Sequence, residues 1–110
     1  MNLNEYQTAA LKTAIYPRVN GAGVAYCTLG LASEAGEVAG KLKKIMRDCG
    51  GAMTDDNRHA MASELGDVLW YAATLAKELG YTLEEIAEMN LSKLADRANR
   101  GKIQGSGDVR

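Results

Sequence analysis

SEAGEV at Ser33–Val38 and SELGDV at Ser63–Val68 are near copies of each other in a chain of 110 residues. Each copy places two acids three positions apart. The pairs are Glu34 with Glu37 and Glu64 with Asp67. Apolar residues around both copies recur at helical spacing, so each copy is expected to lie on a long amphipathic helix. Residues three apart are neighbours on a helix, and the repeat therefore sets like charges side by side.

Turn residues divide the whole chain into four expected helices. These helices span Leu3–Ile15, Tyr26–Arg47, the cap residues Thr54–Asn57 to Leu79, and Thr82 to Ala98. The last begins with a capping box, in which Thr82 is followed three residues later by Glu85. No stretch alternates with the period of a strand. We therefore expect one all-α domain over residues 1–110, with core helices over about 26–98 and a glycine-rich tail over 99–110.

Composition narrows the class of protein. The formal net charge is −1, which argues against a protein that coats a nucleic-acid polymer. There is neither a long apolar run nor a signal-peptide pattern, so we expect a cytoplasmic protein without a membrane partner. Cys27 and Cys49 have no metal-binding spacing and are expected to be reduced thiols.

The acids have a defined position relative to the apolar stripes. Counting about 100° per residue, Glu34 lies at the edge of a stripe and Glu37 lies about 60° outside it. Glu64 and Asp67 repeat these positions on the next helix. The stripes are formed by Leu31, Val38, Leu42 and Ile45, and by Met61, Val68, Ala72, Leu75 and Leu79. Packing the stripes antiparallel would bring four carboxylates together, which requires positive charge, and Mg²⁺ is the usual ion at phosphate-handling sites.

Two other interpretations of the acids remain. They could belong to a solvated helix face, with Glu37 and Lys41 as an ordinary i,i+4 ion pair. They could also form a di-iron centre, but that architecture uses Glu-x-x-His motifs. The single histidine, His59, has no Glu three residues before it, which argues against iron.

Three polar residues share a face of the fourth expected helix. Asn90, Lys93 and Arg97 are spaced three and four apart, at the edge of its apolar stripe. Lysine and arginine both suit binding of a polyphosphate, because the lysine ammonium is a compact point charge and the arginine guanidinium can donate two parallel hydrogen bonds to a phosphate. Cations snorkelling at the edge of a bundle are the alternative. Arg100 and Lys102 follow and could close over a ligand.

Small residues suggest a second packing face. Gly36 and Gly66 occupy equivalent mid-helix positions, although glycine there costs about 1 kcal/mol relative to alanine. Helices with two packing faces in so short a chain favour a homo-oligomer, most simply a two-fold dimer. A compact four-helix monomer is the alternative.

These residues together resemble a MazG-like nucleotide pyrophosphohydrolase. The resemblance lies in GLASEAGEVAGKLKK, ELGDVLWYAATLAKELG and MNLSKLADRANRGKIQGSGD, and it covers most of the chain from Tyr26 to Asp108. The family motif is an ExxE pair followed by an ExxD pair. The matching residues are Glu34, Glu37, Glu64 and Asp67, and downstream Asn90, Lys93 and Arg97.

The resemblance implies the all-alpha NTP pyrophosphatase fold, with a four-helix antiparallel bundle-type subunit completed by dimerisation. It implies a homodimer or dimer of dimers that uses Mg²⁺, with Mn²⁺ as the alternative ion. It also implies hydrolysis of a nucleoside triphosphate, NTP or dNTP, between the α- and β-phosphates, for nucleotide-pool control or house-cleaning.

Roles for individual residues follow from the resemblance and the expected geometry. All four acids would bind metal, with Glu34 or Glu37 also acting on water, and the downstream trio Asn90, Lys93 and Arg97 would bind phosphates. Tyr71, about a turn beyond Asp67, is the preferred base contact, with Tyr26 and Trp70 also considered. The alternative function is a non-catalytic helical dimer that binds a metal–nucleotide complex as a regulator.

Overall fold

The computed structural model describes residues 1–101, 105 and 107, with the side chain of residue 19 left aside. It has four α-helices and a 3-10 turn, and no strand occurs among the described residues. The elements are α1 (Leu3–Leu11), η1 (Val19–Gly21), α2 (Ala22–Cys49), α3 (Asp55–Glu78) and α4 (Leu83–Asn99). The all-α class is therefore confirmed. None of the described helices is long and apolar enough to cross a membrane.

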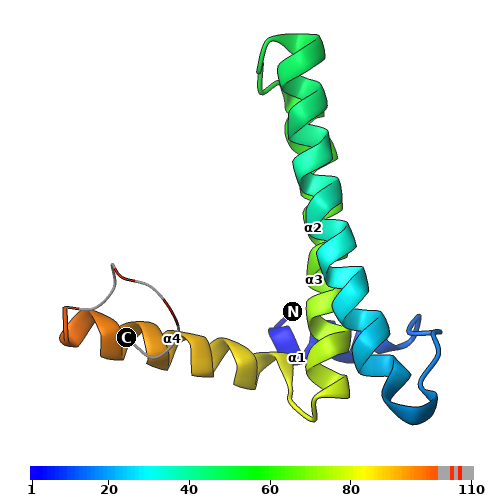
Figure 1. Cartoon of the computed structure of the whole chain (residues 1–110), viewed down its shortest axis with the longest axis vertical. Coiled ribbons are helices and arrows are strands. Elements are labelled where there is room, and N and C mark those ends of the chain that lie inside the picture. Colours follow the sequence, from blue (N-terminus) through cyan, green and yellow to red (C-terminus); the bar gives the residue numbers. More distant parts are fainter. Residues whose placement is uncertain (102–104, 106, 108–110) are drawn as a thin grey trace.

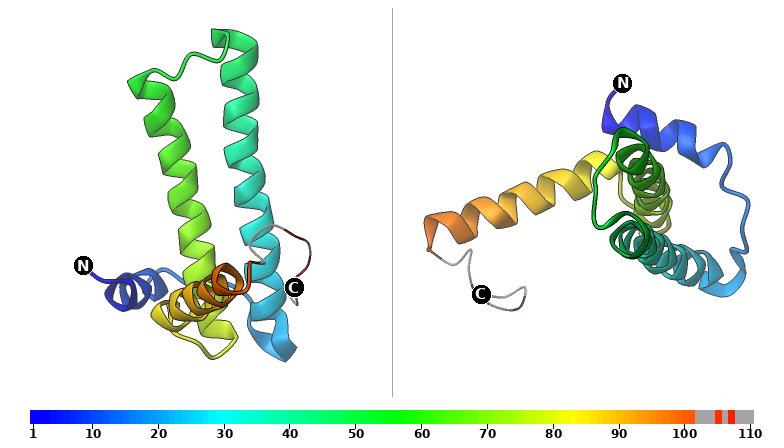
Figure 2. Two further views of the ribbon diagram at one scale, coloured as in Figure 1. Left: turned by 90° about the vertical axis from the view of Figure 1, so that its left-hand side faces the viewer. Right: turned by 90° about the horizontal axis from the view of Figure 1, so that it is seen from above.

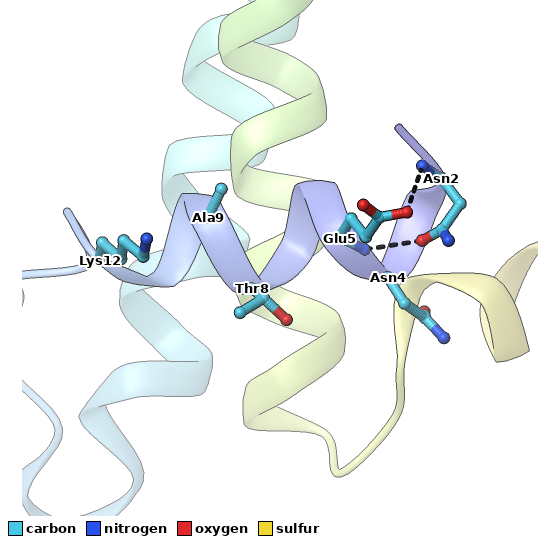
Figure 3. A pocket seen from close by; sticks show the side chains of 6 residues that line it. All are labelled: Asn2, Asn4, Glu5, Thr8, Ala9 and Lys12. Carbon is cyan, nitrogen blue, oxygen red and sulfur yellow. Dashed lines mark hydrogen bonds between the residues drawn. The ribbon is translucent and has the colours of Figure 1, made fainter.

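Local sequence signals account for the helix ends. Asn2 and Glu5 form a reciprocal capping box at the start of α1 (Figure 3). Thr82 and Glu85 form another at α4, as predicted. Thr54 caps α3 by accepting a hydrogen bond from the Asn57 amide. These side chains satisfy backbone N–H groups that have no partner within the helix.

Two boundaries differ from the sequence-based expectation by a full helical turn. The first helix ends at Leu11 instead of Ile15, and the second begins at Ala22 instead of Tyr26. The second difference arises because Gly21 adopts a left-handed conformation, with φ 77°, that starts the helix directly after the turn. Glycine takes this conformation without steric cost. The longer α2 places Gly23 on the helix instead of in the loop, and Tyr26 within the helix instead of at its first residue.

The helices form a long antiparallel hairpin with two shorter helices across one end (Figure 1). α2 and α3 stand side by side as the hairpin, and α1 and α4 lie at its base. α4 contacts α1 and α3 and then extends away from the hairpin (Figure 2). The four helices of one chain therefore do not enclose a shared core along their whole length.

The core sits at the base of the hairpin. Ala10, Ala73 and Leu83 form a buried cluster, with Tyr6 and Trp70 packed against it. These five residues come from α1, α3 and α4. A core of this size stabilises the base and leaves most of the hairpin to be stabilised by other contacts.

Gln7 connects the three helices that meet at this core. Its side chain is buried. Its amide donates to the carbonyls of Ala73 and Tyr81, at 3.1 and 3.2 Å, and accepts from the Leu83 amide at 3.0 Å. These hydrogen bonds favour one arrangement of the helices around the small apolar core, because leaving any of the buried groups unpaired would cost about 1–3 kcal/mol.

One face of the hairpin carries apolar side chains that the described part of the chain leaves exposed. A groove of about 390 Å³ runs along it, which we call the apolar groove. Its lining residues are Val38, Met53, Arg58, Met61, Ala62 and Leu65. Leu65 is 60% exposed and Leu42, on the same side of α2, is 39% exposed.

Candidate metal centre

Three acids converge between α2 and α3. Glu34 comes from α2, and Glu64 and Asp67 come from α3. One carboxylate oxygen of each lies within 4.8 Å of those of the other two. Glu34 and Glu64 are half-buried and Asp67 is exposed. We refer to these three residues as the acid trio.

Glu37 does not belong to this group. It is exposed on α2, one turn after Glu34, and its carboxylate is not within the same short distance of the others. The structure thus brings together three of the four acids selected from the sequence. The fourth lies beside them along the helix and still acts on Glu34 through its charge.

The trio carries more negative charge than its surroundings balance. The pKa of Glu34 is raised above its usual value, first by loss of solvation and then by the charges of Asp67, Glu64 and Glu37. A cation pairs with the trio across the hairpin: Nζ of Lys41 lies 3.9 Å from Oε1 of Glu64. The sequence had suggested Glu37 as the partner of Lys41. At this distance, and half-exposed, the Lys41–Glu64 pair is weak.

The donor set fits a hard divalent cation. Carboxylate oxygens are the preferred ligands of Mg²⁺, Ca²⁺ and Mn²⁺, whereas zinc and iron sites usually include histidine or cysteine. After loss of solvation, the neighbouring carboxylate charges also contribute to the raised pKa of Glu34. A bound cation would relieve that charge.

A row of aromatic side chains lies between the trio and the base of the hairpin. Tyr16 stacks on Tyr26 with ring centroids 5.3 Å apart, Tyr26 is tilted against Tyr71 at 6.4 Å, and Tyr71 meets Trp70 edge-on at 5.0 Å. Trp70 also donates a hydrogen bond to the Ala10 carbonyl, which ties it to the packing of α1.

Tyr71 is half-buried in this row. Its ring lies directly over Gly30 of α2, where any side chain would collide with it. The pKa of Tyr71 is raised, first by burial, then by interaction with Tyr26 and by the negative charge of Glu34. The residue selected as a base contact therefore lies close to the trio, and one side of its ring is covered by α2.

Sequence reasoning missed a contact that fixes the loop before α2. Glu78, near the end of α3, accepts a 2.8 Å hydrogen bond from the Tyr16 hydroxyl and pairs with Arg18 at 3.1 Å. The Arg18 guanidinium also lies 4.6 Å from the centre of the Tyr16 ring. Gly23 leaves room for this cluster, because a Cβ there would lie 2.7 Å from the Glu78 carboxyl carbon. No local pattern signals a contact between residues 62 positions apart.

The polar residues of α4 are not brought to the trio within one chain. Asn90 and Lys93 are exposed and Arg97 is buried. All three belong to α4. This helix extends away from the hairpin (Figure 2) and has no packing contact with α2 among the described elements. Arg100 pairs with Asp96 at 2.9 Å. Lys102 lies outside the described residues.

A surface depression on α1 is separate from this centre. It measures about 390 Å³ and is lined by residues of α1 and of its two ends. These are Asn2, Asn4, Glu5, Thr8, Ala9 and Lys12 (Figure 3). None of these residues belongs to the trio or the aromatic row, so the depression has no part in the metal centre.

Comparison with known proteins places this geometry in a family. The model of the MazG nucleotide pyrophosphohydrolase domain matches residues 24–101, a span that includes the trio, Glu37 and the polar residues of α4. The chain therefore belongs to the MazG nucleotide pyrophosphohydrolase family. It is also similar to the Gene 37 protein of Mycobacterium phage L5, with 49% identity over 114 residues that cover both chains completely. No solved structure matches.

Proposed function

We propose that the protein hydrolyses nucleoside triphosphates between the α- and β-phosphates, giving a nucleoside monophosphate and pyrophosphate in a Mg²⁺-dependent reaction. The observation that carries the proposal is the convergence of Glu34, Glu64 and Asp67 within 4.8 Å. Membership of the MazG family supports the reaction class. Control or cleaning of the cytoplasmic nucleotide pool is the role that this reaction would serve.

Each acid has a role in this proposal. The trio holds the ion, which when bound would offset phosphate charge and lower the pKa of a bound water. Glu37 is left outside the trio, so we assign it the water, with Glu34 as the other carboxylate considered for this step. The water oxygen bonds to the α-phosphorus and its proton passes to the carboxylate. The bond from the α-phosphorus to the bridging oxygen then breaks and pyrophosphate leaves.

The proposal includes a homodimer or a dimer of dimers. Two observations support it: the exposed apolar groove and the direction of α4, away from its own hairpin. Asn90, Lys93 and Arg97 would then bind phosphates at the centre of a partner subunit. Covering the groove would also extend the small core found at the base of each chain.

A product assay tests the reaction. The protein is incubated with Mg²⁺ and each common NTP and dNTP, and pyrophosphate is separated from orthophosphate. We expect pyrophosphate and monophosphate, lost on addition of EDTA, and the ranking of nucleotides identifies the substrate. Orthophosphate together with a nucleoside diphosphate would show that the protein cleaves a different bond from the one proposed. Binding of nucleotide in Mg²⁺ without any product would favour the non-catalytic regulator.

A further inference from the structure

The face of the hairpin that carries the acid trio continues with lysines toward the hairpin tip. Lys41 and Lys44 follow Glu34 by seven and ten residues. Both lie within about 80° of Glu34 around α2, on its solvent side, about 10 and 15 Å further along the axis. In the opposite direction the same face carries Tyr26 and Tyr71. Acids are therefore flanked by aromatics on one side and by cations on the other.

The two lysines line a cleft between α2 and α3. The cleft measures about 250 Å³ and is lined by Lys41, Lys44, Ile45, Asp48, Cys49, Asn57 and Ala60. It adjoins the metal centre, because Lys41 reaches to 3.9 Å from Glu64. Its volume is below the 300–1,000 Å³ of pockets for drug-sized molecules, and it suits a small inorganic anion better than a whole nucleotide.

The one acid in the cleft is already compensated. Both carboxylate oxygens of Asp48 accept hydrogen bonds from Arg47, at 2.7 and 2.9 Å, and this interaction holds the pKa of Asp48 below its usual value. Asn57 donates its side-chain amide to the Ala52 carbonyl at 2.7 Å. The cleft therefore presents two ammonium groups against a neutralised carboxylate, which favours an anion.

We propose that Lys41 and Lys44 bind the β- and γ-phosphates, and that the triphosphate lies along the hairpin with its base toward Tyr26 and Tyr71. The α-phosphate is then at the trio, and pyrophosphate is released into the lysine cleft. This inference rests on the proposed function and gives the substrate a direction on the hairpin. It also places phosphate-binding cations beside the acid trio of the same chain. The cations of α4 do not reach the trio of their own chain.

The weakness of the Lys41–Glu64 pair is consistent with this role. The ion pair is at 3.9 Å and the Lys41 side chain is 41% exposed, so exchanging it for a phosphate loses little. A lysine that served only to balance the acids would be expected to sit closer to them. Lysine is a flexible point charge, and it can follow phosphates through bond cleavage.

Pyrophosphate binding tests the lysine cleft directly. Calorimetric titration of the full-length protein with pyrophosphate in Mg²⁺ is compared for wild type, Lys41→Gln, Lys44→Gln and the double variant. Each substitution should weaken binding about tenfold, the usual loss for a charge-assisted hydrogen bond. Lys43→Gln is the matched control, because Lys43 belongs to the same basic run and does not line the cleft. Glutamine keeps helix propensity, so the helices are retained.

The outcomes separate this inference from the proposed function. Weaker pyrophosphate binding by the variants, with unchanged Mg²⁺ affinity, supports the lysine cleft even if no nucleotide is hydrolysed. Absence of nucleotide hydrolysis would overturn the proposed function and not the cleft. Wild-type binding by the double variant overturns the cleft. Loss of pyrophosphate binding in Lys93→Gln, together with wild-type binding in Lys41→Gln and Lys44→Gln, would also overturn the cleft and would place the terminal phosphates on α4.

Discussion

The α2–α3 hairpin has two faces of opposite character. The polar face carries the acid trio, the lysine cleft and the aromatic row, and its side chains already meet within one chain. The apolar groove on the other side is open, with Leu65 60% exposed. The three candidate metal ligands are thus brought together by one chain, whereas the apolar groove offers a second surface that could stabilise the hairpin. The two functions can therefore be disrupted separately.

The largest effect is expected on the polar face. Glu64→Gln keeps the shape of the side chain and removes a charged ligand. We expect turnover to fall at least about 100-fold, because even the outer-shell partners of metal sites contribute 10–100-fold. Helicity and oligomer size should not change, as measured by circular dichroism and size-exclusion chromatography. Asp56→Asn, an exposed acid on the same helix, is the control, and collapse of the fold in Glu64→Gln would indicate a structural acid instead.

The next effect is expected on the apolar groove. Leu65→Lys places a charge beside Arg58 in the groove. If the groove is the dimer interface, two copies each lose about 1.5–3 kcal/mol of apolar burial, which raises the dissociation constant about 100-fold or more. Sedimentation velocity measures the shift to monomer. Thr8→Lys adds the same charge on exposed α1, and equal behaviour of the two variants would rule out the groove as the interface.

Alanine substitutions at two glycines of α2, Gly30 and Gly36, compare the packing inside the hairpin with that on its outer surface. Gly30→Ala would drive a methyl group into the Tyr71 ring, and such overpacking costs about 1–3 kcal/mol. We expect the melting temperature to fall by about 5 °C or more. A wild-type value would mean that Tyr71 can move away from Gly30 at no cost.

Gly36→Ala is the matched control on the same helix. Nothing lies within 4 Å of the added methyl group, and alanine gains about 1 kcal/mol of helix propensity. We therefore expect a higher melting temperature with the oligomer intact. A lower one, with dissociation, would show that a partner helix packs at the small residues instead of the apolar groove.

The smallest effect concerns pH in the absence of metal. Because the pKa of Glu34 is raised in the folded state, the folded protein binds this proton more tightly than the unfolded chain. Stability should therefore decrease as pH rises from about 4.3, the usual pKa of Glu, through the raised folded value. The charges that act on this carboxyl group are those of Asp67, Glu64 and Glu37, and Lys41 pairs with Glu64 at 3.9 Å.

Glu34→Gln should flatten this pH dependence in thermal melts recorded with EDTA. Glu88→Gln, an exposed acid on α4, should retain it. The lowered pKa of Asp48 acts in the opposite direction, below about pH 3.9, so the two ranges do not overlap. An unchanged slope in Glu34→Gln would contradict the electrostatic account of the trio.

Local signals predicted the helices, and angular positions predicted much of the centre. Capping residues such as Thr82 and the periodic stripes act over a few residues, so the sequence displays them directly. The angle of Glu34 and Glu64 to their stripes anticipated that they would face each other. The position of Glu37 depends on how closely the helices approach, which no single helix encodes.

The direction of α4 was outside the reach of such reasoning. It depends on long-range contacts, among them those of Gln7, which bonds to Ala73 and Leu83 across 66 and 76 positions of the chain. Asn90, Lys93 and Arg97 share a helix face as expected, but a shared face does not state which surface it meets. Long-range polar contacts of this kind have no periodic signature.

Gln7 lies where a small change in position would be magnified along α4. The buried amide fixes the start of α4 at Leu83, and Arg97 lies about 21 Å further along the helix. A tilt of about 10° at the fixed end displaces the far end by about 4 Å, by simple geometry on a helix of this rise. Shortening this side chain by one carbon, as in Gln7→Asn, would therefore have its largest effect on position at Arg97, although Gln7 lies on α1 and Arg97 lies near the far end of α4. The angle between α1 and α4 is thus a quantity that selection can adjust through two side-chain amides of α1, Gln7 at Leu83 and Asn4 at Glu84.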